Sequence, residues 1–143
     1  MKNMNQKILP KAIIVDMDGT LADTSHRNPY DTANCLQDAL HHAMRETVVR
    51  YHQAGYTIVI LTGRDDKWAG LTSQWLHHHN VPYDVLIMRP ETMRGQKGPI
   101  VKQALFDTQI RDEYDVEWAF DDMTEIIQMW KSIGVPCIQV NDG

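Results

Sequence analysis

Hydrophobic and polar residues alternate along the chain in blocks that favour buried strands followed by amphipathic helices. Short, continuous runs of apolar, often β-branched residues are typical of strands covered on both faces, whereas apolar residues three or four positions apart are typical of helices. By these criteria, strands are expected at residues 12–15, 56–61, 84–88, 116–120 and 136–140. Helices are expected at residues 31–54, 66–79, 99–110 and 124–133.

The ends of these helices carry recognisable stop signals. Gly55 and Gly134 follow the first and the last helix, and Asn80 and Pro82 follow the second. Glycine and asparagine tolerate the left-handed backbone that closes a helix, and proline cannot continue one. The strict alternation of strands and helices predicts an α/β fold, a three-layer, Rossmann-like arrangement with a parallel five-stranded sheet and right-handed crossovers.

Composition limits the class of protein. The chain has 143 residues, 43% of them hydrophobic, which suffices for one packed core, so we expect a single domain over residues 1–143. A net charge of −5 argues against a surface that is basic throughout but allows a local basic patch. Two cysteines are too few for a disulfide framework, and no run approaches the about 18 apolar residues of a membrane span. We therefore expect a reduced, cytoplasmic protein without a signal peptide or membrane contact.

Polar residues follow four of the expected strands, at the point where each strand ends. Ligands of open parallel sheets bind at the carboxyl ends of the strands, so side chains gathered there are candidates for chemistry. The candidates are Asp16 and Asp18 after the first strand, Thr62, Gly63 and Arg64 after the second, Arg89 after the third, Lys97 before the next helix, and Asp121 and Asp122 after the fourth.

The segment DMDGTL at residues 16–21 carries the most specific signal. Asp16 and Asp18 are two positions apart at a strand end, so both carboxylates can face one rim, and Gly19 allows a sharp turn. Two such carboxylates suit Mg²⁺, which offsets the repulsion between an attacking carboxylate and a phosphate, while the second carboxylate can act as acid and base. A lone DxD is often only a turn or a helix cap, but the apolar strand before this one favours chemistry.

Three further groups complete the predicted site. The Thr62 hydroxyl and the backbone N–H groups relaxed by Gly63 can bind phosphoryl oxygens. Lys97 supplies a point charge for a phosphate, and we rank it above Lys102, which is expected on the solvated face of its helix. Asp122 is expected to hold the metal ion and Asp121 to assist it or to orient Lys97, although either could instead cap the helix that follows.

These elements, in this order, resemble the haloacid dehalogenase superfamily of phosphatases, and the resemblance covers nearly the whole chain. It implies that Asp16 is the nucleophile and Asp18 the general acid and base. It also implies that Thr62 and Lys97 hold the phosphoryl group and that Asp121 and Asp122 complete a magnesium site.

The chain also resembles a narrower family, the 3′-phosphatase domain of phage polynucleotide kinase-phosphatases. The similar segments are DGTL at 18–21, RNPYD at 27–31, LTGR at 61–64, MRP at 88–90 and IQMWKSIGVPCIQV at 127–140. This resemblance implies removal of 3′-phosphates from DNA or RNA ends, with Arg27, Arg64 and Arg89 as substrate contacts. Each arginine could instead form a surface salt bridge.

The segments between the expected elements are too short for the large cap domain of many related phosphatases, so an open site is expected. No GxxxxGK[ST] motif occurs, so no kinase activity is expected from this chain, and a separate kinase or ligase partner is compatible with the resemblance. Two alternatives stay open: a phosphatase of small nucleotides such as nucleoside monophosphates, and a non-catalytic binding module that retains the fold. The presence of all four aspartates disfavours the second.

Overall fold

A five-stranded parallel sheet forms the centre of the molecule. The computed structural model describes residues 7–141, and the strand order is β5-β4-β1-β6-β7, with every neighbouring pair parallel. The strands are β1 (Lys11–Val15), β4 (Thr57–Asp65), β5 (Val85–Arg89), β6 (Asp115–Asp121) and β7 (Cys137–Gln139). The chain runs outward in one direction from β1 to β4 and β5, and in the other to β6 and β7. The carboxyl end of β1 therefore lies at the point where the strand order reverses, which is where such sheets bind ligands.

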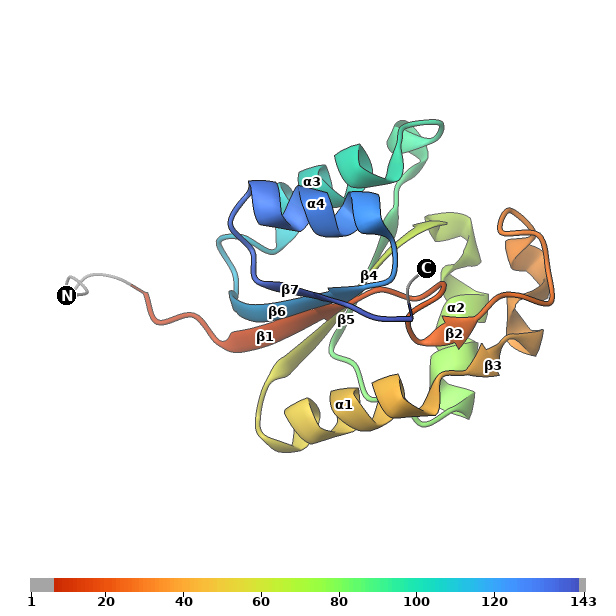
Figure 1. Ribbon diagram of the computed structural model, residues 1–143, viewed down its shortest axis with the longest axis horizontal. Helices are drawn as coiled ribbons and strands as arrows, with labels where there is room; N and C mark the ends of the chain where they lie inside the picture. The colour runs from red at the N-terminus through yellow and green to blue at the C-terminus, as the bar shows by residue number, and fades with distance from the viewer. Residues whose placement is uncertain (1–6, 142–143) are drawn as a thin grey trace.

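Helices cover both faces of this sheet, as Figure 1 shows, with α3 and α4 on one face and α1 and α2 on the other. Their bounds are α1 (His42–Gln53), α2 (Ala69–His78), α3 (Gly98–Gln109) and α4 (Thr124–Ser132). Successive residues of β1 point to opposite faces, so Ile14 packs in the apolar cluster under α3 and α4, while Ile13 and Val15 pack in the cluster under α1 and α2. The predicted three-layer α/β fold is confirmed.

The expected helix at residues 31–54 is wrong in its first half. That region forms a 3₁₀ helix, η1 (Thr32–Gln37), a short strand β3 (Ala39–Leu40) and only then α1; β3 pairs antiparallel with β2 (Ala22–Asp23). The helix breaks at Asp38, whose backbone is extended. The Asp38 carbonyl accepts a hydrogen bond from the indole N–H of Trp75 in α2, at 2.9 Å, and its carboxylate is buried in an ion-pair network. These tertiary contacts outweigh the helical spacing of the sequence.

Two other boundaries matter for the site. β4 continues beyond Leu61 to Asp65, so Thr62, Gly63 and Arg64 lie on the strand itself, and the first turn of the next helix is a separate 3₁₀ helix, η2 (Asp66–Trp68). A further 3₁₀ helix, η3 (Glu91–Met93), follows β5. Between β1 and β4 the described chain forms only η1, the β2–β3 pair and α1, and none of these is a large cap domain. No helix within residues 7–141 is long and apolar enough to cross a lipid bilayer.

Candidate active site

The loop after β1 is shaped by its own backbone hydrogen bonds. The Met17 carbonyl accepts hydrogen bonds from the N–H groups of Thr20, Leu21 and Ala22, and the Thr20 hydroxyl donates to Asp16 at 3.1 Å. Gly19 has φ +82°, and a Cβ at this position would collide with the Oδ2 atom of Asp122. Only glycine both adopts this backbone and lets the loop approach the end of β6 so closely.

Three carboxylates meet where β1 and β6 end. Asp16, Asp121 and Asp122 are all buried, and each contributes an oxygen within 4.8 Å of the others. Asp121 is held by the N–H of Met123, at 3.1 Å from its Oδ1 atom. Because parallel strands β1 and β6 are neighbours, their carboxyl ends bring together residues that are more than 100 positions apart in the sequence.

Lys102 is the ammonium group of this cluster. Its Nζ atom donates to Asp16 Oδ1 at 2.9 Å and to Asp121 Oδ2 at 2.6 Å, and the residue is only 5% exposed. The expectation that Lys102 lies on a solvated helix face is therefore wrong. Lys97 is exposed, precedes α3, and lines the same cavity farther out, so its predicted contact with the reacting phosphate stays a prediction.

A signal for Lys102 is present in the sequence. The buried residues of α3 are Val101, Lys102, Leu105 and Phe106, which form one stripe facing the sheet. A lysine within the apolar stripe of an amphipathic helix must find a buried counter-charge, because an unpaired charge is too costly to bury. Counting helical spacing forward from Pro99 would have placed Lys102 on the inner face and Lys97 outside the helix.

The electrostatics of this cluster suit a divalent cation. Burial raises the pKa of Asp16 well above its usual value; the Lys102 ammonium opposes this rise, and repulsion from Asp121 adds to it. Burial, followed by repulsion from Asp121, raises the pKa of Asp122 to about 6. Burial disfavours the charged form of Lys102, but attraction to Asp16 and Asp121 outweighs burial and raises its pKa.

One buried atom in the cluster lacks a partner. Among the described residues, the Oδ1 atom of Asp122 is the buried side-chain oxygen that accepts no hydrogen bond. An unpartnered carboxylate oxygen beside two other carboxylates is what a hard divalent cation would satisfy, since such ions take oxygen ligands. Asp16, Asp121 and Asp122 therefore fit a divalent metal ion.

Asp18 lies apart from these three carboxylates. Its Oδ1 atom accepts hydrogen bonds from Arg64, at 2.5 Å from Nη2, and from Arg27, at 3.2 Å. The structure thus does not bring Asp18 into the acidic cluster as a metal ligand. Both guanidinium groups are almost fully buried and hold Asp18 in this structure, so neither forms the exposed salt bridge that was the alternative for it, and their contact with substrate stays a prediction.

Asp38 is a member of this network that the sequence did not reveal. Its carboxylate is fully buried and accepts from Arg27 Nε at 2.8 Å, from Arg64 Nη2 at 3.3 Å and from His26 at 2.6 Å. Two arginines placed between two aspartates are balanced in charge, which is the condition for burying them. Because Asp38 was expected inside a helix, no local pattern distinguished it from an exposed acidic residue.

The remaining predicted residues line the same cavity in different ways. The Thr62 hydroxyl is buried and accepts a hydrogen bond from the N–H of Arg64 at 3.2 Å. Arg89 donates to the carbonyl of Gly63 at 2.9 Å and to that of Gln96 at 2.6 Å, so it braces the loop after β5 against β4.

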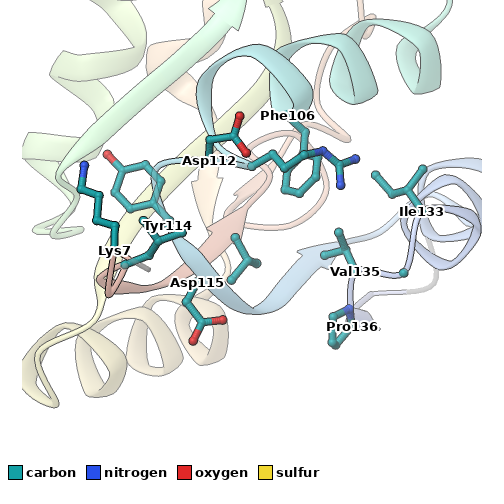
Figure 2. Close-up of a pocket in the computed structure, with 12 residues that line it drawn as sticks. Lys7, Phe106, Asp112, Tyr114, Asp115, Ile133, Val135 and Pro136 are labelled. Carbon is teal, nitrogen blue, oxygen red and sulfur yellow. The ribbon is translucent and has the colours of Figure 1, made fainter. Parts of the chain in front are cut away.

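The cavity above these groups has a volume of about 730 Å³. Its buried part includes Asp16, Thr62, Lys102 and Asp121, and its outer part is lined by residues of η2 and of the segment before α3. A second cavity, of about 710 Å³, is drawn in Figure 2. It lies at the opposite end of the sheet and shares no lining residue with the first. It is lined by the chain before β1 and by the ends of α3 and α4, including Phe106, Tyr114 and Val135.

Comparison with known proteins shows which proteins this chain resembles. The model of the family described as polynucleotide kinase PNKP phosphatase domain matches residues 10–143. A protein of Autographa californica nuclear polyhedrosis virus that carries the name bifunctional polynucleotide kinase/RNA ligase is 30% identical in an alignment of 134 residues, and the alignment covers 90% of this chain and 19% of that protein.

Solved structures agree with this relationship. A chain of a Pnkp1/Rnl/Hen1 complex superposes with a TM-score of 0.92 and 34% identity, over 96% of this chain and 48% of that one. The class C acid phosphatase from Bacillus anthracis superposes with a TM-score of 0.67 at 16% identity, over 93% of this chain and 66% of that enzyme, which shows a shared fold alone. The chain thus spans about half or less of the length of the first two relatives.

Proposed function

Because this chain belongs to the family of polynucleotide kinase phosphatase domains and is a phosphatase of the haloacid dehalogenase type, we propose that it removes 3′-phosphates from polynucleotide ends. The observation that carries this proposal is the buried Asp16 carboxylate, hydrogen-bonded to Lys102 beside two further carboxylates at the end of β1. A family match over nearly the whole chain directs that chemistry toward a nucleic-acid end.

Asp16 is the proposed nucleophile. One carboxylate oxygen attacks the phosphorus atom, the bond from phosphorus to the 3′ oxygen breaks, and an aspartyl phosphate forms while Asp18 gives a proton to the leaving oxygen. Water then attacks the phosphorus atom of this intermediate and gives a proton to Asp18. The bond from phosphorus to the Asp16 oxygen breaks, which restores the Asp16 carboxylate and releases inorganic phosphate. Arg27 and Arg64 hold Asp18 at the side of the cavity for both proton transfers.

Charge compensation is the main task of the surrounding groups. Mg²⁺ is the proposed cofactor, with Asp16, Asp121 and Asp122 as its protein ligands, and it would offset the repulsion between the Asp16 carboxylate and the substrate phosphate. Lys102 takes the role that the sequence suggested for Lys97, because it is the buried ammonium next to Asp16. The Thr62 hydroxyl and the Gly63 backbone are proposed to bind phosphoryl oxygens.

The remaining expectations about the biological setting are also proposals. The two relatives are longer than this chain, and their names refer to a polynucleotide kinase, an RNA ligase and a Pnkp1/Rnl/Hen1 complex. We propose that this phosphatase works with a kinase or ligase, so that an end carrying a 3′-phosphate is converted to one that can be joined. A cytoplasmic location and one domain over residues 1–143 are proposed with it.

A substrate panel tests the proposed reaction. Hydrolysis of a 3′-phosphorylated oligonucleotide is compared with that of nucleoside 3′- and 5′-monophosphates, in Mg²⁺ and in a chelator. Fastest hydrolysis of the oligonucleotide, abolished in the chelator, supports the proposal; a preference for a nucleoside 5′-monophosphate would favour the alternative of a nucleotide phosphatase.

Variants test the nucleophile. Asp16→Asn should abolish turnover while the fold is retained, as measured by circular dichroism. The matched control Asp112→Asn, at the opposite end of the sheet, should keep normal turnover. Near-normal turnover by Asp16→Asn would remove the case for an aspartyl phosphate.

A further inference from the structure

Five residues at the mouth of the catalytic cavity have no part in the chemistry described above. They are Tyr30, Lys67, Trp68, Arg94 and Lys97, and are called the outer rim. We infer that the outer rim is a second binding subsite, which takes the single-stranded nucleotides that precede the terminal 3′-phosphate. This inference rests on the proposed function and adds how the enzyme tells a polymer end from a free nucleotide.

The cavity is divided by depth. Its catalytic groups are buried, whereas Tyr30 is 94% exposed and Lys67, Arg94 and Lys97 are exposed as well. A volume of about 730 Å³ lies in the upper part of the range of about 300–1,000 Å³ that is usual for ligand sites. A phosphate bound at the buried end therefore leaves the outer part open to the rest of the substrate.

The outer rim is built by three separate parts of the chain. Lys67 and Trp68 belong to η2, which follows β4, and Arg94 and Lys97 lie between η3 and α3, after β5. Tyr30 comes from the loop between β2 and η1. Since β4 and β5 are neighbours, the loops after them lie side by side at the carboxyl end of the sheet. The outer rim is thus continuous with the catalytic end rather than a patch elsewhere on the surface.

The charge of the cavity is opposite to that of the chain. The whole chain has 14 Lys and Arg residues against 19 Asp and Glu residues. Among residues 7–141, however, the cavity is lined by six Lys and Arg residues and by four Asp residues. Lys67 and Lys97 form no ion pair within the described part of the chain, and Arg94 approaches Asp65 and Glu91 only at 3.8 and 3.7 Å. These exposed cations are available for the phosphates of a nucleic-acid backbone.

Aromatic groups lie among these cations. Trp68 is half-buried, with the Lys67 ammonium 5.1 Å from the centre of its ring, and the Tyr30 ring is open to solvent. Proteins that bind single strands combine cations along the backbone with aromatic rings on which unpaired bases stack. A base that is paired in a duplex is already stacked on its neighbours, so this arrangement favours a single-stranded end.

The test compares a polymer with small substrates. Trp68→Ala, and the double variant of Lys67→Ala with Arg94→Ala, are assayed on a 3′-phosphorylated single-stranded oligonucleotide, a nucleoside 3′-monophosphate and an aryl phosphate. The matched control is Lys131→Ala, which removes an exposed lysine that does not line the cavity. For Trp68→Ala, the rise in KM for the oligonucleotide should exceed that for the aryl phosphate about tenfold.

Salt dependence gives a readout that a purely structural role would not change. For the double variant, the slope of log kcat/KM against log salt on the oligonucleotide should become shallower by about 0.7 for each backbone phosphate that the protein no longer neutralises. Equal decreases in activity on the oligonucleotide and the aryl phosphate, or an unchanged slope, would overturn the inference. A wild-type preference for duplex over single-stranded 3′ ends would also overturn it.

Binding separates this inference from the proposed function. If the wild type hydrolysed no 3′-phosphate, the proposed function would fail. The outer rim would then be tested by fluorescence anisotropy with a labelled single-stranded oligonucleotide and the Asp16→Asn variant. Adding Trp68→Ala should weaken that binding about tenfold, whereas Lys131→Ala should not. Equal affinities for all three proteins would overturn the subsite by itself.

Discussion

Replacing Lys102 with methionine is the most direct test of the site, because the structure and the sequence-based expectation name different lysines. Methionine keeps the length and apolar character of the side chain and removes the ammonium group. Lys102 Nζ lies 2.9 Å from Asp16 Oδ1 and 2.6 Å from Asp121 Oδ2. With an effective dielectric constant of about 20, each of these ion pairs is worth about 6 kcal/mol before the cost of burying the charges.

Removal of the ammonium leaves two buried carboxylates, those of Asp16 and Asp121, without their cationic partner. Breaking a buried ion pair from one side costs about 3–5 kcal/mol, so the free energy of unfolding should fall by about 3 kcal/mol in a chelator. Burial disfavours the charged form of Lys102, but attraction to the Asp16 and Asp121 carboxylates outweighs burial and raises the pKa of Lys102 above the unfolded value of about 10.4. Its contribution to stability is thus fully present below about pH 10 and is lost only as pH rises through the folded-state pKa, so measurements near neutral pH report all of it.

Turnover should respond more strongly than stability. Loss of one preorganised group that stabilises developing charge lowers kcat about 10²–10³-fold, and Lys102→Met should show a decrease of this size with an aryl phosphate. Lys97→Met, at the exposed mouth of the cavity, should lower kcat less than about tenfold on the same substrate, since it removes no buried charge partner. Urea unfolding in a chelator and steady-state assays in Mg²⁺ give both quantities. Inactivation by Lys97→Met with near-normal turnover by Lys102→Met would refute this reasoning.

Three more predictions concern the metal site and the network behind it. Mg²⁺ should raise the melting temperature at neutral pH, and this rise should be much smaller at a pH clearly below 6, because burial raises the pKa of Asp122 to about 6 and a protonated carboxyl is a poor ligand. Asp122→Asn should remove the rise at any pH. A rise in melting temperature that is as large at low pH as at neutral pH would contradict the assignment of Asp122 as a ligand. Gly19→Ala should weaken Mg²⁺ binding measured by calorimetry, because its Cβ would collide with the Asp122 carboxylate, whereas Gly70→Ala in α2, with open space around it, should stabilise by about 0.4–1 kcal/mol. Asp38→Asn should lower the free energy of unfolding measured in urea by about 3–5 kcal/mol. Asp38→Asn and Arg27→Ala should each lower turnover of an oligonucleotide and of an aryl phosphate equally, since Asp38 and Arg27 belong to the network that holds Asp18. If Arg27→Ala lowered turnover of the oligonucleotide alone, Arg27 would contact the substrate instead.

The fold could be predicted because its signals are local. β1 and the first half of β4 are nearly continuous apolar runs, since central parallel strands are covered on both faces, and glycine or proline follows most of the helices. The expected strands at residues 12–15 and 116–120 differ from β1 and β6 by no more than one residue at either end. The exception is the region around Asp38, where a hydrogen bond from Trp75 and a buried ion-pair network end a helix that the spacing favours.

Three aspartates of the acidic cluster, Asp16, Asp121 and Asp122, were predictable from the sequence, but the separate position of Asp18 and the partners of these carboxylates were not. DxDGT after a buried strand and a second Asp pair after another strand indicate phosphate chemistry by themselves, and the structure brings Asp16, Asp121 and Asp122 together. The identity of the lysine depends on which face of α3 meets the sheet. The role of Arg64 depends on a loop 46 positions earlier in the chain.

The difference has one physical cause. The hydrophobic effect is non-directional, so burying an apolar side chain requires no particular partner. The pattern of apolar residues within one strand or helix is therefore enough to show which face is buried. An ion pair needs two particular groups within a few ångströms, and here Lys102 meets Asp16 across 86 positions of sequence. The sequence alone was enough to indicate an α/β phosphatase with carboxylates at its strand ends. The order of β1, β4 and β6 in the sheet decided which cation lies beside Asp16, which arginines hold Asp18, and which cations remain exposed at the mouth of the cavity.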